Sequence, residues 1–240
     1  AFFAPPVPPA APQGGAEPPR AEAQQATEGL AEPAEAAANF CLIAGKNTQY
    51  PKLGGAIAGR IRDHGSVEIQ AVGVQAAHVA VRAVALAEQM LAENEPRETR
   101  GEALAFVPRF AEVVDSAADA RWPAKRVLEL AVRPLPRPET RDIYCQGTAN
   151  SDENLSPMAG AIKRAIAENG TSVVLASGPA LVYRAVKALV TAGKFMQEEQ
   201  DQEVAVASFP QFEQWHQWGS DKKRSQVVFA CVRHSPVAPS

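Results

Sequence analysis

Cysteine and long apolar runs are both scarce in this chain of 240 residues. The three cysteines, Cys41, Cys145 and Cys231, are far apart, and none belongs to a Cys-x-x-Cys motif or a Cys/His cluster. This usage argues against structural zinc and against a disulfide framework, and it fits a reducing compartment. No stretch approaches the roughly 20 apolar residues that cross a bilayer, so we expect no membrane-spanning helix.

The chain also lacks a strong charge of either sign. Its formal net charge is −3, and residues 1–39 hold five Glu against Arg20, which leaves the remainder near neutral. A dedicated nucleic-acid binder is usually strongly basic, and this one is not.

Residues of catalytic type do not gather in the sequence. There is no P-loop and no Gly-x-Gly-x-x-Gly motif. Cys41 and Cys145 fall in predicted strands, where a buried thiol is ordinary. His64 precedes a helix-ending glycine, and His78 has no acidic or nucleophilic neighbour at helical spacing. We therefore expect a protein that is not an enzyme, with no cofactor and no metal site.

What the chain does contain is an internal repeat. Residues 53–90 align without a gap on residues 158–195, at a constant offset of 105 positions, and the second copy extends to Met196. The alignment pairs Gly65 with Gly170 and Gly73 with Gly178, with apolar positions in phase around them. Shared glycines at one spacing indicate one supersecondary unit used twice.

Each copy predicts the element order β-α-β-α-β-β. Apolar runs, helical periodicity and helix-ending glycines place the elements. In the first copy they are strand 40–44, helix 53–64, strand 67–72, helix 74–91, strand 104–107 and strand 126–133. In the second they are strand 143–145, helix 158–169, strand 172–176, helix 180–195, strand 204–207 and strand 226–232. The fold class is thus α+β, with a first domain over 40–133 and a second over 139–240.

Two segments lie outside these domains. Residues 134–138, Pro-Leu-Pro-Arg-Pro, are expected to continue neither a ladder nor a helix, and we take them as the linker. Residues 1–39 form an extended Ala/Pro-rich segment with too little apolar surface to fold alone, so we expect a partner to hold it.

The first copy resembles a known family. The run from Leu53 to Gly73, then Ala80 to Val84, the Pro108-Arg109-Phe110 element and the closing Leu130 to Pro134 are similar to stage V sporulation protein S, a small Alba-like bacterial protein. The second copy keeps the glycines and has Val173-Val174-Leu175 in place of Glu68-Ile69-Gln70. The resemblance implies two Alba-like domains, and Alba relatives mostly bind DNA or RNA as dimers. A tandem copy would form an internal pseudo-dimer, for which we expect contact through the second helices.

Two sets of surface residues compete as binding sites. Tryptophan and basic residues in a predicted hairpin over 212–224 favour a protein partner, together with two aromatics of the N-terminal segment. These partner-binding candidates are Phe2, Phe3, Trp215, Trp218, Lys222, Lys223 and Arg224. The same hairpin is compatible with contact to a membrane surface, and its tryptophans with a role as caps of the domain core. The alternative function, nucleic-acid binding, would use Lys46, Lys52, Arg60, Arg62, Arg109, Lys125 and Arg126.

The opening Ala1 to Pro6 resembles the Ala-Phe-x-x-Pro start of proteins imported into plastids of red-algal origin. This implies a chloroplast stromal protein or one on the stromal face of the thylakoid. From the near-neutral core charge we expect an accessory, structural subunit at the periphery of a photosystem and its antenna, with other protein subunits as partners. A DNA- or RNA-binding protein, including one associated with an organellar ribosome, is the alternative.

Overall fold

The computed structural model describes residues 41–94, 101–113, 125–139, 144–146, 154–200, 203–216 and 223–235. All of them belong to one unit, Asn39–Ser240. The extended segment 1–39 expected from the sequence lies outside the described residues.

Both copies have the predicted order of elements. The first is built from β1 (Cys41–Ala44), α1 (Tyr50–His64), β2 (Val67–Ala71), α2 (Val74–Asn94), β3 (Glu102–Val113) and β4 (Lys125–Pro136). The second is built from β5 (Tyr144–Gln146), α4 (Ser156–Asn169), β6 (Thr171–Ala176), α5 (Gly178–Gln200), β7 (Ala205–His216) and β8 (Lys223–His234). We refer to them as repeat one and repeat two. The α+β fold with two β-α-β-α-β-β units is confirmed.

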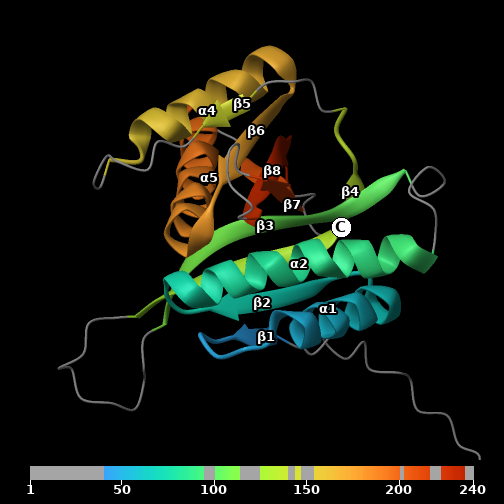
Figure 1. The fold of residues 1–240 in the computed structure, drawn as a ribbon. Coiled ribbons are helices and arrows are strands. Elements are labelled where there is room, and N and C mark those ends of the chain that lie inside the picture. The colour runs from blue at the N-terminus through green and yellow to red at the C-terminus, as the bar shows by residue number, and fades with distance from the viewer. Residues whose placement is uncertain are drawn as a thin grey trace, which may run out of the picture. The chain divides into compact units, whose positions relative to one another are not determined.

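The strands of both repeats form one sheet of eight strands in the order β1-β2-β4-β3-β7-β8-β6-β5 (Figure 1). This order reads the same from either edge once each strand is replaced by its counterpart. The outer pairs β1–β2 and β5–β6 are parallel, and all other pairs are antiparallel. The arrangement is that of two copies related by an approximate twofold axis between β3 and β7.

The first helix of each repeat ends where the sequence predicts. Gly65 and Gly170 follow α1 and α4 with φ of 73° and 75°, and their N–H groups donate to Ile61 and Ile166. Because a left-handed backbone has no steric cost at glycine, this position ends the helix with its last carbonyl satisfied. The repeated glycine spacing thus marks helix ends.

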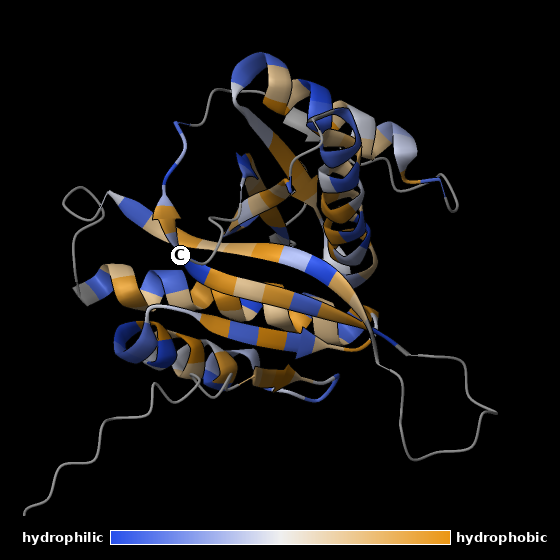
Figure 2. Cartoon of the chain, turned by 180° about the vertical axis from the view of Figure 1, so that it is seen from behind, coloured by the Kyte–Doolittle hydropathy of each residue, from blue (hydrophilic) through white to orange (hydrophobic). Residues whose placement is uncertain are grey.

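The helices cover one face of the sheet, and strand side chains alternate toward and away from it. Val67, Ile69 and Ala71 of β2 are buried with the helices, whereas Glu68 and Gln70 point to the opposite face. Figure 2, seen from behind, shows the strands of repeat one in front of α1 and α2. We call the face without helices the open face. The period of two is that of a half-buried strand.

The hairpin strands are much longer than predicted. β3 and β7 each span 12 residues, where the sequence suggested four. Pro108 and Pro210 caused this error, because proline within an apolar run demotes a predicted strand. The backbone N–H of Leu104 donates to Glu88 and not to β4. Since backbone N–H groups alternate sides along a strand, every second position of β3 counted from Leu104, including 108, faces β7 and not β4. A proline at position 108 therefore removes no bond of the β3–β4 ladder.

Residues 134–138 were expected to continue no β-ladder, and for residues 134–136 this expectation is wrong. Pro134 and Pro136 lie in β4, opposite Leu104 and Glu102 of β3. The neighbour on the other side, β2, pairs with β4 only as far as Val132. The missing N–H groups of these prolines then face an edge with no strand, where proline is tolerated. The domain boundary itself stays a prediction.

The repeats meet where β3 and β7 pair, and the only paired position in the described chain is Phe106 with Ser208. Extending this register would place Leu104 opposite Pro210 and Val206 opposite Pro108. Each proline lacks the donor that a longer ladder needs, so the pairing stops on both sides. Behind this junction α2 also contacts α5, as the sequence predicted for the second helices. We call this region the inter-repeat joint.

Candidate functional site

The partner-binding candidates of repeat two lie near the free end of the β7–β8 hairpin. Trp215 is opposite Arg224 in the ladder, and His216 is opposite Lys223. Trp215 therefore belongs to strand β7 of this hairpin. Trp218, Lys222, Phe2 and Phe3 lie outside the described residues.

Four of the nucleic-acid candidates share one end of the sheet. Lys46 follows β1 and Lys52 lies in the first turn of α1. Lys125 and Arg126 begin β4, and Leu128 of that strand pairs with Ala71 at the carboxyl end of β2. Loop, helix start and hairpin end therefore converge at the carboxyl ends of β1 and β2. Arg60 and Arg62 lie near the other end of α1.

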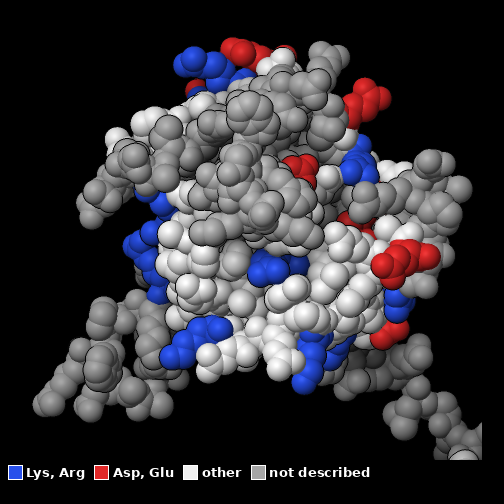
Figure 3. Space-filling model, in the orientation of Figure 1, with Lys and Arg blue, Asp and Glu red and all other residues white. Residues whose placement is uncertain are grey.

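The surface of α1 is basic. The helix carries Lys52, Arg60 and Arg62 against Asp63, and Lys46 precedes it. In Figure 3, Lys and Arg side chains lie over the lower part of the molecule, where Figure 1 shows α1. The start of α1 adds backbone N–H groups that suit an anion.

Arg109 does not belong to this basic surface. On the open face its Nε donates to Glu129 at 2.6 Å and its Nη2 donates to Glu68 at 3.1 Å. Gln70 also donates to Glu129, at 3.0 Å. The hydrogen bond to Glu129 is the main cause that raises the pKa of Arg109. We call these four residues the open-face network, and its two carboxylates exceed its one cation, so it offers a phosphate no net attraction.

Repeat two has no such network. The β-ladder registers place Val173, Leu175, Gln211 and Val228 at the positions of Glu68, Gln70, Arg109 and Glu129. Val173 is buried, and Leu175 and Val228 are half-buried. At three of these four positions the polar or charged residue of repeat one is thus replaced by an apolar one in repeat two.

The Pro-x-Phe element, repeated in both copies, forms cross-repeat contacts at the joint. Phe212 of β7 lies 4.7 Å from the Arg82 guanidinium of α2, which also lies 4.0 Å from the Tyr50 ring. In the counterpart, Phe110 of β3 meets Tyr183 of α5 edge to face at 6.3 Å. Each phenylalanine thus reaches the second helix of the other repeat.

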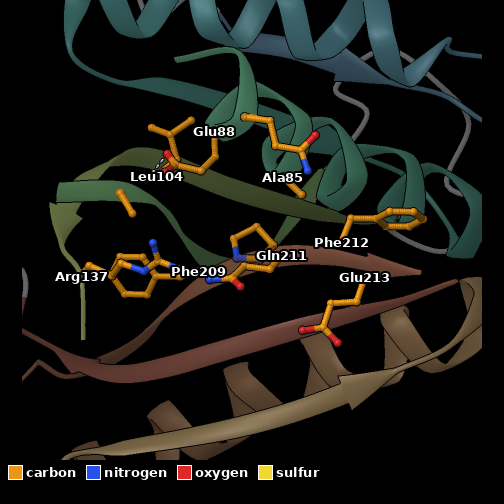
Figure 4. A pocket seen from close by; sticks show the side chains of 11 residues that line it. Ala85, Glu88, Leu104, Arg137, Phe209, Gln211, Phe212 and Glu213 are labelled. Carbon is orange, nitrogen blue, oxygen red and sulfur yellow. Dashed lines mark hydrogen bonds between the residues drawn. The ribbon is translucent and has the colours of Figure 1, made fainter. Parts of the chain in front are cut away.

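A pocket of about 160 Å³ opens beside the joint, between α2, β3 and β7 (Figure 4). Its lining includes Ala85, Glu88 and Gln89 of α2, Arg137 after β4, and Phe209 to Glu213 of β7. Glu88 is only 7% exposed, and its Oε2 accepts the Leu104 N–H at 2.8 Å. The carboxylate replaces the strand partner that Pro210 displaces. We call this cavity the joint pocket.

The same place in repeat two is closed. Gly193 stands at the position of Glu88, and a Cβ added there would lie 3.4 Å from Ala205 Cα and 3.6 Å from Val206 N. Helix α5 therefore packs directly on the backbone of β7. The sequence analysis missed Glu88, although the alignment at offset 105 pairs a carboxylate with a glycine there.

The Cys41 thiol and the His78 imidazole are not among the residues that line the joint pocket. Burial, and next the charge of Glu68, raise the pKa of the Cys41 thiol, which disfavours the nucleophilic thiolate. Burial and then Arg82 lower the pKa of His78. The part of the chain that the structure describes contains no group of three or more His, Cys, Asp or Glu placed to hold a metal ion. Among those residues, too, no helix has the length and apolarity to cross a bilayer.

Comparison with known proteins agrees with the repeat architecture. A sequence profile of the stage V sporulation protein S family matches residues 41–127 and again residues 148–234. No curated protein matches the chain. The first match spans β1 to the start of β4 and the second spans α4 to β8, so each covers most of one repeat. The chain therefore belongs to the stage V sporulation protein S family, as a tandem duplication of its domain.

Proposed function

We propose that the chain is a non-catalytic nucleic-acid-binding protein in which the two repeats act as an internal pseudo-dimer. The observation that carries this proposal is the gathering of Lys46, Lys52, Lys125 and Arg126 at one end of the repeat-one sheet, beside the start of α1. A phosphate backbone running along α1 would then meet Arg60 and Arg62 as well. Helix starts and lysines of this kind hold phosphates by charge and backbone N–H groups.

The approximate twofold axis supports contact at two places. The β3–β7 pairing is antiparallel, so the hairpin β3–β4 ends at one end of the sheet and β7–β8 at the other. The second hairpin carries Lys223 and Arg224 at the start of β8. Two hairpins with basic ends, fixed relative to each other by the joint, suit an extended polyanion. With few cations in total, we expect weak binding that depends strongly on salt.

The test is fluorescence anisotropy of the full chain with labelled single- and double-stranded 20-nucleotide probes, between 50 and 200 mM salt. We expect K46Q/K52Q to weaken binding several-fold and to lower the slope of log affinity against log salt by about one to two. The matched control is R109Q, whose cation is already paired with carboxylates and whose loss should leave affinity unchanged. Salt-independent binding, or equal effects of the two variants, would contradict the proposal.

The second candidate function is a structural subunit that binds a protein through repeat two. It is favoured by the apolar open face, where the half-buried Leu175 and Val228 replace Gln70 and Glu129 of repeat one. The neighbouring hairpin supplies Trp215 and Trp218 as anchors. W215A/W218A should release the protein from its native complex with little change in Tm. Unfolding of this variant would instead assign the tryptophans to the domain core.

Plastid import remains a prediction from residues 1–6, which lie outside the described part of the chain. A place at a photosystem remains a prediction from the near-neutral charge of the remaining residues. Identifying what co-purifies with the native protein tests both.

A further inference from the structure

Arg82 of α2 is held at the inter-repeat joint by two aromatic rings. Its guanidinium carbon lies 4.0 Å from the centre of the Tyr50 ring and 4.7 Å from the centre of the Phe212 ring. Tyr50 is the first residue of α1 and Phe212 belongs to repeat two, so elements of both repeats meet at this side chain. A guanidinium that lies over a ring is stabilised through its flat face and keeps the N–H donors at its edge for other partners.

These donors have no acceptor in the described part of the chain. Arg82 forms no hydrogen bond or ion pair with a described residue, in contrast to Arg109 of the open-face network. The side chain is half-buried. Burial, and next the charge of Arg82, lower the pKa of His78 one turn earlier on α2. The joint therefore holds a cation that is fixed in position and that no described carboxylate neutralises.

The internal duplication preserves a cation at this place. Residues 53–90 contain three Lys or Arg, and at the offset of 105 positions only Arg82 has a basic counterpart, Lys187, whereas the other two align with alanine. Lys187 also lies against a ring, 5.0 Å from the centre of Tyr183, and it too has no hydrogen bond or ion pair with a described residue. An apolar side chain would pack on these rings without the cost of partly burying a charge. A charge kept in both copies therefore indicates an anionic ligand.

We propose that Arg82 and Lys187 each bind a phosphate group of a nucleic-acid strand that crosses the joint. The inference rests on the proposed nucleic-acid function and adds contacts between its two basic hairpins. The Tyr50 ring that holds Arg82 is two residues from Lys52 in the first turn of α1, so the strand passes from one cation to the next. The edge of a guanidinium donates two parallel N–H bonds to a phosphate, and the rings keep that edge in place.

A carboxylate of a protein partner is the competing anion. Arginine donates to carboxylates and phosphates alike. A nucleic-acid strand carries one negative charge at every nucleotide, however, and so supplies Lys52, Arg82 and Lys187 together. An acidic side chain supplies one of them. The duplication of the cation and its nearness to Lys52 therefore favour the strand.

The experiment compares R82M with R109M in the full chain, by anisotropy with the probes and salt range given above. Methionine keeps an unbranched stem against the rings and removes the charge. R82M should weaken binding several-fold and lower the slope of log affinity against log salt by about one, and R82M/K187M should lower it by about two. R109M, the same change at a cation already paired with carboxylates, is the matched control and should bind as the parent chain does.

NMR of the arginine Nε–H groups detects the contact in the parent chain and does not depend on the folding of any Met variant. The resonance of Arg82 is assigned by its absence in R82K. It should shift when the oligonucleotide is added, whereas that of Arg109 should stay in place. R82K keeps the charge and should retain a salt slope close to that of the parent.

The inference is overturned if R82M and R109M bind alike, or if the probe leaves the Arg82 resonance in place. It is also overturned if poly-glutamate of equal charge concentration shifts this resonance as far as the probe does, which would assign the site to an acidic protein. A lower Tm of R82M with an unchanged salt slope would assign Arg82 to packing of the joint alone.

The two proposals fail separately. If the probes bind with salt dependence and R82M binds as R109M does, only the contact at the joint fails. If the probes do not bind the parent chain and inorganic phosphate still shifts the Arg82 resonance, the nucleic-acid function fails and Arg82 binds free phosphate.

Discussion

The two repeats share one helix-covered face and differ on the face without helices. On the covered face, Ile69 and Val174 occupy equivalent places in β2 and β6, and both are fully buried. On the open face, Glu68 in repeat one corresponds to Val173 in repeat two. A side chain packed between sheet and helix is constrained by volume, whereas one on an open face is free to change chemistry. The duplication therefore preserved the fold and altered a surface.

The joint shows a second difference of the same kind. Glu88 of α2 accepts a backbone N–H of β3, whereas Gly193 lets α5 lie against the backbone of β7. Helix and strand thus make different contacts at equivalent places in the two repeats. This difference between Glu88 and Gly193 breaks the approximate twofold symmetry of the repeats, whereas the strand order preserves it.

Exchanging the residues at positions 88 and 193 should have the largest effect on the free energy of unfolding. G193E forces a long side chain against the β7 backbone, and overpacking of this kind costs about 3 kcal/mol. E88G leaves the Leu104 N–H without its acceptor and adds a helical glycine, for about 2 kcal/mol. Urea unfolding measures both. G160E is the control for G193E, because the space around Gly160 is open. A G193E variant as stable as G160E would show that the close packing at the joint is not a constraint.

A smaller effect is expected when the open face of repeat one is converted toward that of repeat two. R109Q leaves the carboxylates of Glu68 and Glu129 without their shared cation, and we expect a loss of about 1 kcal/mol. Because Arg109 is 61% exposed, solvent screening keeps the loss small. Adding E129V should recover most of it, since the repulsion between the two carboxylates is then removed. A double-mutant cycle by urea unfolding measures this coupling, and additive losses would contradict it.

The smallest effect concerns pH. His234 of β8 contacts Arg133 of β4, and burial followed by the charge of Arg133 lowers the pKa of His234. A lowered pKa in the folded state means that the unfolded chain binds the proton more tightly. Stability should be fully present above the ordinary histidine pKa of about 6.5 and fall as the pH drops below it.

H234L places in β8 the residue that repeat one has at the equivalent position, Leu135. The variant should lose less in Tm between pH 7.5 and pH 5.5 than the parent chain, by no more than about 2 °C. If H234L and the parent chain show the same pH dependence, His234 does not cause the loss of stability at low pH.

The sequence predicted the element order because each signal was local. Apolar periodicity gave the helices and short strands, and the glycines at 65 and 170 marked helix ends by their backbone conformation. The hairpin strands were underestimated because Pro108 and Pro210 break a strand pattern, and only the ladder shows that their missing N–H groups face a gap in the pairing. The candidate Lys and Arg residues were identified from the sequence by residue type. Whether a carboxylate pairs with such a residue, as with Arg109, depends on residues distant in the chain.

By itself, the sequence determined the duplication, the β-α-β-α-β-β order of each repeat and the contact between the second helices. These follow from patterns within a few residues or from a fixed offset of 105 positions. The tertiary structure alone decided that the two sheets merge through one residue pair among the described strands, and that Arg109 is neutralised by Glu68 and Glu129. It also decided that Glu88 lines a pocket, whereas its counterpart Gly193 packs on the backbone of β7. The physical reason is that pairing, neutralisation and packing depend on which residues the fold brings together, and for Arg109 these lie 41 and 20 positions away.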